Sequence, residues 1–97
     1  MSKRQIKWSA KAVGQRKLIT DWYQTTLGNL AAMHFNHDVN STVDSLSQMP
    51  TIGRIDLKFS SAKFQYYSFV FHKRYAIVYR FTSRTLYIIA FRATQML

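Results

Sequence analysis

Four arginines in the last third of the chain carry the side chain best suited to binding phosphate or carboxylate oxygens. A guanidinium group presents several N–H donors in one plane and stays charged at physiological pH. Arg74 and Arg80 lie in a segment whose pattern predicts a strand, and period-two alternation puts both on one face. Arg84 is expected in a turn and Arg92 at the end of the last strand. Each position is equally compatible with a solvated strand edge or turn.

Other side chains offer weaker indications of chemistry. Lys58 and Lys63 lie in a segment where phosphate contact and plain solvation are both open interpretations. His34 and His37 stand three positions apart beside Asp38, a pattern that can face one metal ion on a helix. Their spacing is loose and a further ligand is missing, so we interpret them as residues on a polar helix face. We expect no metal site and no cofactor.

The charge balance is the most informative feature of the composition. Fourteen Lys and Arg face four Asp and no Glu in 97 residues, which gives a formal net charge of +10. So strong a positive field in a small protein attracts polyanions or an acidic protein partner. The alternative is that the charge serves solubility alone, although solubility rarely needs such an imbalance.

The remaining composition predicts one folded domain over residues 1–97. Hydrophobic residues make up 47% of the chain, which argues against disorder. The absence of cysteine excludes a disulfide scaffold and a thiolate metal site. No apolar run approaches the ~18 residues of a spanning helix, and no signal-peptide pattern opens the chain. We therefore expect a cytoplasmic protein with no membrane partner.

The first half of the chain predicts a short strand and two antiparallel helices. Residues 5–8 alternate polar and apolar, and Ser9 can cap a helix that runs to about Thr26. Gly28 suits the end of that helix. The expected inward face of the first helix carries Ala12, Ile19, Trp22 and Tyr23. The second helix has one continuous apolar stripe, made of Ala32, Phe35, Val39, Val43 and Leu46.

Pro50 and Gly53 mark the junction between a helical half and a sheet half. Pro50 cannot continue a helix, and Gly53 would allow a tight turn. Beyond them, three segments rich in aromatic and β-branched residues predict an antiparallel meander, over 66–71, 75–81 and 86–92. Residues 55–59 add a further strand or remain an extended loop.

The expected fold class is therefore α+β, with element order β-α-α-β-β-β. The N-terminal strand would complete a small, mainly antiparallel, twisted sheet. The helical hairpin would pack on one face of this sheet and leave the other face uncovered by helices.

Four segments resemble, in chain order, the RelE/ParE superfamily of toxins from bacterial type II toxin–antitoxin systems. IKWSAKAVGQRKLITDWY resembles the opening strand and first helix of that superfamily, and VDSLSQMPTIGR its leucine–proline–glycine junction. KRYAIVYRF resembles the central strand, with the aliphatic pair Ile77-Val78 before Tyr79. LYIIAFRATQ resembles the last strand, which ends near an arginine. The resemblance covers nearly the whole chain and implies a RelE/ParE-like fold.

The resemblance implies one of two toxic activities. RelE-like members are similar to metal-independent endoribonucleases that cut messenger RNA in the ribosomal A site. ParE-like members poison DNA gyrase and have no clear catalytic site. Both kinds are neutralised by a cognate antitoxin that wraps the toxin, commonly through an acidic or amphipathic segment. The implied partners are thus an acidic antitoxin and, as target, either DNA gyrase or messenger RNA on the ribosome.

Departures from the RelE-like pattern favour the ParE-like, non-enzymatic branch. RelE-like members carry an arginine three residues before the strand tyrosine, where this chain has Ala76. Arg74 lies two residues earlier, an offset of about 6–7 Å along a strand. The expected tail, residues 93–97, has no titratable side chain, and the chain has no glutamate to act as a base.

Two alternatives stay open at this point. The first is a RelE-like endoribonuclease with Arg74, Arg80 and Arg92 as candidate catalytic cations, helped by Tyr66, Tyr79 or His72. The second is a basic nucleic-acid-binding module whose exposed aromatic side chains stack on bases. In every case the candidate residues for contact with nucleic acid or another target are Lys58, Lys63, Arg74, Arg80, Arg84 and Arg92.

Overall fold

The computed structural model describes residues 3–72 and 74–94 of the chain. It begins with strand β1 (Gln5–Trp8), helix α1 (Ala10–Leu27) and helix α2 (Asn29–Gln48). A short 3₁₀ helix, η1 (Pro50–Ile52), leads to strands β2 (Arg54–Ile55), β3 (Tyr67–Phe71), β4 (Tyr75–Phe81) and β5 (Thr85–Ala93). The described residues contain no helix long and apolar enough to cross a membrane.

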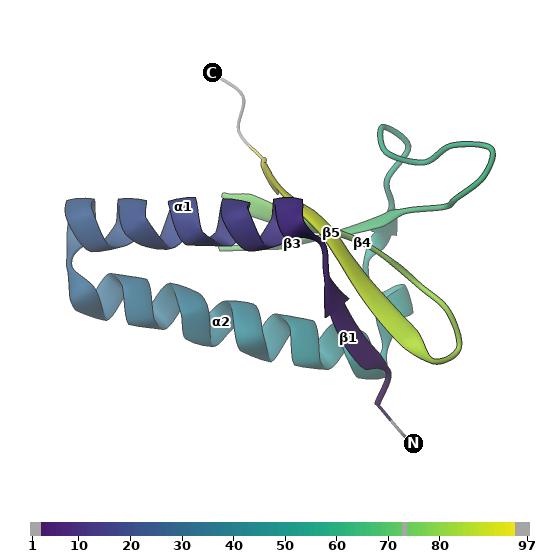
Figure 1. Cartoon of the computed structure of the whole chain (residues 1–97), viewed down its shortest axis with the longest axis horizontal. Coiled ribbons are helices and arrows are strands. Elements are labelled where there is room, and N and C mark those ends of the chain that lie inside the picture. Colours follow the sequence, from purple (N-terminus) through teal and green to yellow (C-terminus); the bar gives the residue numbers. More distant parts are fainter. Residues whose placement is uncertain (1–2, 73, 95–97) are drawn as a thin grey trace.

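The five strands form one sheet in the order β1-β5-β4-β3-β2. β1 pairs with β5 in parallel, and the other three neighbouring pairs are antiparallel. The two helices lie together on one side of the sheet, as Figure 1 shows. The predicted α+β class, the element order and the closing role of the first strand are confirmed.

The helical hairpin forms largely as its sequence signals predict. The Ser9 hydroxyl caps α1 by accepting a hydrogen bond from the Ala12 N–H at 3.0 Å, and Gly28 has the positive φ of 99° that the turn requires. All five stripe residues of α2 are buried in the hydrophobic core. Trp22, however, is 43% exposed and does not join the core. Neighbouring helix residues point about 100° apart, so Trp22 cannot share the inward direction of the buried Tyr23.

The junction after α2 is fixed by Tyr79, which is fully buried. Its hydroxyl donates to the Pro50 carbonyl at 2.5 Å and accepts from the Gly53 N–H at 3.2 Å. The chain bends at Gly53, where a tight turn was expected, but with an ordinary φ of −79° the bend does not require the left-handed region. Glycine is needed for space, because a Cβ would lie 2.3 Å from the Tyr79 Oη and 2.7 Å from the Ser68 carbonyl oxygen.

The segment between β2 and β3 is a loop over residues 56–66 (the β2–β3 loop), because only Arg54 and Ile55 pair as a strand. We call the side of the sheet opposite the helices the outer face. Ala76 and Val78 alternate with the helix-facing core residues of β4 and so point to this face, yet both are buried. The β2–β3 loop contacts the outer-face side chains of β4 and β5, as the arginine contacts below demonstrate.

Candidate functional site

Arg92 ties the last strand to the β2–β3 loop. Its Nη2 donates to Asp56 Oδ2 at 2.8 Å, and the Asp56 side chain is only 3% exposed. The other carboxylate oxygen accepts from the backbone N–H groups of Lys58 and Phe59 at 3.0 and 3.2 Å. Sequence reasoning missed Asp56, although it is one of only four carboxylates in a chain with fourteen cations. Arg92 therefore has an internal counterion.

Arg80 lies further along the outer face, between two aromatic rings. Its guanidinium carbon is 4.5 Å from the centre of the Phe64 ring and 4.0 Å from that of Tyr87. Lys63 also lies over the Phe64 ring, with its Nζ 5.5 Å from the ring centre. Two candidate cations from the sequence are thus brought together around one aromatic side chain of the loop.

Arg74 does not share a face with Arg80, contrary to the alternation argument. It precedes the first residue of β4 and belongs to the β3–β4 turn, where strand alternation does not apply. Its guanidinium carbon lies 5.7 Å from the centre of the Trp22 ring on α1, on the helix side of the sheet. The structure therefore separates Arg74, Arg80 and Arg92 into three different surroundings. The catalytic and binding roles of these residues remain predictions.

The other titratable candidates have structural surroundings of their own. His72, in the β3–β4 turn, contacts the Asp38 carboxylate through its Nε2 and packs edge-on against Phe35. Burial raises the pKa of Tyr79 to about 12, and its hydroxyl is already bonded within the core. Lys58 and Arg84 are exposed. Within residues 3–72 and 74–94, no three His, Cys, Asp or Glu side chains gather as a metal site would need. Residues 95–97 of the expected tail lie outside the described residues.

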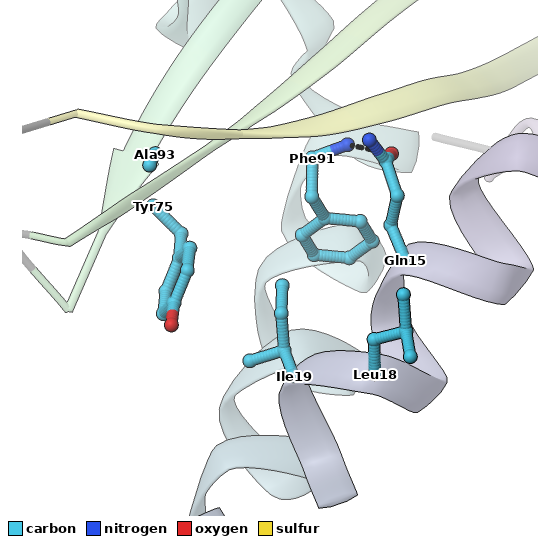
Figure 2. A pocket seen from close by; sticks show the side chains of 6 residues that line it. All are labelled: Gln15, Leu18, Ile19, Tyr75, Phe91 and Ala93. Carbon is cyan, nitrogen blue, oxygen red and sulfur yellow. Dashed lines mark hydrogen bonds between the residues drawn. The ribbon is translucent and has the colours of Figure 1, made fainter. Parts of the chain in front are cut away.

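An apolar pocket of about 190 Å³ opens between α1 and the ends of β4 and β5. Figure 2 shows its six lining residues, Gln15, Leu18, Ile19, Tyr75, Phe91 and Ala93. The Gln15 side chain fixes one wall by accepting a hydrogen bond from the Phe91 backbone N–H at 2.7 Å. Leu18 is 71% exposed at its rim. This pocket has the size and character to receive an apolar side chain of a partner.

A family model for the ParE toxin of the type II toxin–antitoxin system parDE matches residues 6–97 of the chain. The chain belongs to the ParE toxin family. A solved structure described as the chromosomal ParDE toxin–antitoxin system from P. aeruginosa has the same fold, with a TM-score of 0.77. At 17% sequence identity the match covers 96% of this chain and 98% of that one. None of the curated proteins is a significant match.

Membership of the ParE family accounts for the arrangement of the elements seen here. The ParE-like chain combines a helical hairpin, a proline-containing junction and a meander into one sheet, as the four sequence segments implied. The fold and the toxin family predicted from those segments are both confirmed.

Proposed function

We propose that this ParE-family toxin arrests growth by binding DNA gyrase in the cytoplasm, without cleaving RNA, and that an acidic cognate antitoxin neutralises it. The gyrase proposal rests mainly on which side chains occupy the outer face of the sheet. Ala76 stands at the position of the RelE-like arginine and is completely buried. A general acid, a general base and a phosphate-binding cation must lie within reach of one substrate for RNA cleavage.

Three contacts within the described residues argue against such a catalytic arrangement. Arg92 is bound to the buried Asp56, and Tyr79 uses its hydroxyl inside the junction. Arg74 lies over Trp22 on the other side of the sheet. The candidates for ribonuclease chemistry therefore do not converge on one phosphate-sized space. A toxin that acts by occupying a protein surface needs no such convergence.

The proposed antitoxin contact uses the apolar pocket between α1 and β5. An apolar side chain of the antitoxin would fill the pocket beside Leu18, Ile19 and Phe91. Arg74 lies at the neighbouring turn with an exposed guanidinium, and it makes no ion pair among the described residues. An acidic residue flanking the apolar anchor would complement this charge. The net charge of +10 would steer the encounter and make the association salt-sensitive.

The target can be tested by following two readouts in the same bacterial culture. After induction of the toxin, plasmid supercoiling reports on gyrase, and primer extension on several messages reports on RNA cleavage. We expect disturbed supercoiling with intact messages. Ribosome-dependent cuts in the parent that disappear in Arg74→Ala, Arg80→Ala or Arg92→Ala would contradict the gyrase proposal. Lys17→Ala, an exposed cation of α1, is the charge-matched control.

The antitoxin contact can be tested with two leucines that are both exposed. Leu18→Asp puts a carboxylate at the rim of the apolar pocket, whereas Leu57→Asp puts one in the β2–β3 loop. We expect Leu18→Asp to weaken binding of the cognate antitoxin by about tenfold or more, as loss of a central apolar contact does. Leu57→Asp should change affinity little. Equal effects of the two substitutions would assign the contact to another surface.

A further inference from the structure

The aromatic sandwich around Arg80 fixes the orientation of a guanidinium group at the surface. Phe64 of the β2–β3 loop and Tyr87 of β5 lie 4.5 and 4.0 Å from its central carbon. Aromatic contacts on the guanidinium faces leave the N–H donors at its edge pointing away from the rings. Arg80 makes no hydrogen bond or ion pair with any residue that the structure describes. The N–H donors of Arg80 therefore have no acceptor among the described residues.

The carboxylates of the chain lie elsewhere, so this charge is not balanced locally. The chain has four aspartates, and each is engaged by a different cation or histidine. The pairs are Lys3–Asp44, Lys17–Asp21, His72–Asp38 and Arg92–Asp56. None of these carboxylates neutralises Arg80 or Lys63. The positive charges of Arg80 and Lys63 are therefore available to bind an anion from outside the chain.

The space beside Arg80 alternates cations with aromatic rings. A groove of about 400 Å³ is lined by Lys63, Phe64, Tyr67, Arg80 and Phe81, among others. We call it the Arg80 groove. Lys63 lies over Phe64, which is 36% exposed. Arg4 lies over the Phe81 ring, with its guanidinium carbon 5.4 Å from the ring centre.

We propose that the Arg80 groove binds single-stranded nucleic acid. A backbone phosphate would accept hydrogen bonds from the edge of Arg80 and would be attracted by the charge of Lys63, and a base would stack on the exposed part of the Phe64 ring. Grooves that combine tracking cations with aromatic stacking surfaces bind single strands with little sequence preference. An acidic peptide would satisfy the cations but would leave the aromatic faces unused, so the combination favours nucleic acid. A duplex keeps its base faces stacked internally and cannot use them either.

This site is separate from the proposed antitoxin pocket. The Arg80 groove lies where the β2–β3 loop meets the start of β3 and the end of β4, whereas the apolar pocket lies between α1, the start of β4 and the end of β5. A substitution in the Arg80 groove is therefore not expected to weaken the proposed antitoxin contact.

The first test measures binding of the purified chain to a fluorescein-labelled oligothymidylate by fluorescence anisotropy at several salt concentrations. An oligonucleotide of about twelve residues spans a typical single-strand site. We expect Arg80→Gln to weaken binding about tenfold or more and to reduce the salt slope by about 0.7 for the lost phosphate contact. Lys17→Gln removes the same charge from α1 and should weaken binding less than about twofold, because it acts only through the diffuse field. Equal losses in the two variants would overturn the proposal.

A second pair of variants tests the stacking component and remains informative if Arg80→Gln proves unstable. Phe64→Leu removes the aromatic face and Phe64→Tyr retains it. We expect Phe64→Leu to weaken binding about fivefold or more with an unchanged salt slope, and Phe64→Tyr to bind like the parent. Equal binding by both Phe64 variants would overturn the stacking role and with it the proposal. Tighter binding of an oligoglutamate peptide than of the oligonucleotide, with the same dependence on Arg80, would assign the groove to an acidic protein instead.

Discussion

The hydroxyl of Tyr79, in the centre of the sheet, donates a hydrogen bond of 2.5 Å to the carbonyl of Pro50, where the helical half of the chain ends. The same hydroxyl accepts from the Gly53 N–H, so one buried side chain satisfies both polar groups of the junction. Together with the Arg4 N–H bond to the Ser47 carbonyl, this phenol helps to fix the end of α2 against the sheet. Removal of this hydroxyl should destabilise the protein more than removal of a hydroxyl from an exposed tyrosine.

We expect Tyr79→Phe to lower the free energy of unfolding by about 1–3 kcal/mol, because it leaves the Pro50 carbonyl and the Gly53 N–H without a partner in a buried setting. Urea denaturation followed by circular dichroism measures the change. Tyr67→Phe is the matched control, since the Tyr67 ring stacks on Tyr79 and its hydroxyl makes no hydrogen bond among the described residues. A loss in Tyr67→Phe as large as that in Tyr79→Phe would show that the junction bonds contribute little.

The raised pKa of Tyr79 predicts a loss of stability in alkaline solution. Burial holds the pKa of the folded state at about 12. An unfolded tyrosine ionises near pH 10, so between about pH 10 and 12 the unfolded chain gives up a proton that the folded chain keeps. Stability must then fall as the pH rises, by up to about 1.4 kcal/mol per pH unit for this residue.

The measurement compares urea unfolding of the parent and of Tyr79→Phe at about pH 9 and 11. Tyrosines that do not interact with Tyr79 contribute equally to both proteins, so the difference between the two reports chiefly on Tyr79 and its neighbour Tyr67. We expect this difference to shrink at the higher pH. A constant difference would mean that Tyr79 ionises at its ordinary pKa in the folded protein.

Gly53→Ala should destabilise the protein by about 1–3 kcal/mol, because the added methyl group collides with the Tyr79 Oη and with the Ser68 backbone. A backbone atom cannot move aside as the end of a flexible side chain can. Gly14→Ala is the opposite control, since nothing lies within 4 Å of its added Cβ and it is inside helix α1. That substitution should stabilise by about 0.5–1 kcal/mol. Thermal unfolding of both variants provides the test. A melting temperature of Gly53→Ala at or above that of the parent would disprove the steric argument.

Asp56→Ala should cost about 2–4 kcal/mol, because it deprives Arg92 and two loop N–H groups of their buried acceptor. Hydrogen exchange should also become faster across the β2–β3 loop. Asp21→Ala removes an exposed carboxylate paired within helix α1 and should change stability by less than about 0.5 kcal/mol. Unaltered exchange in the loop of Asp56→Ala would show that other contacts hold this segment.

The helical half could be predicted from sequence because its signals are local. The five-residue stripe of α2, the Ser9 cap and the Gly28 turn each depend on neighbours within one or two helical turns. The strands were equally recognisable from their aromatic and β-branched content. The resemblance of four ordered segments then supplied the topology that periodicity alone does not give.

The candidate site could not be predicted to the same depth because its contacts are distant in sequence. Arg92 binds Asp56, which lies thirty-six positions away, and no sequence pattern around either residue predicts the pair. Arg74 was assigned to the wrong side, because alternation was extended one residue beyond the start of β4. The steric need for glycine at position 53 could not be predicted, since its close approach to Tyr79 depends on tertiary packing that a sequence does not display.

The parallel pairing of β1 with β5 joins the beginning of the described chain to its final strand, with Gln5 opposite Thr85 and Trp8 opposite Ile88. During translation β1 has no partner until β5 has left the ribosome, and pairing across so long a separation is slow. The growing chain must therefore pass through a stage in which the helical hairpin exists but the sheet that it covers is incomplete. A premature stop codon before β5 would leave both β1 and β4 with open edges. Such a fragment should be degraded or aggregate rather than act as a partial toxin.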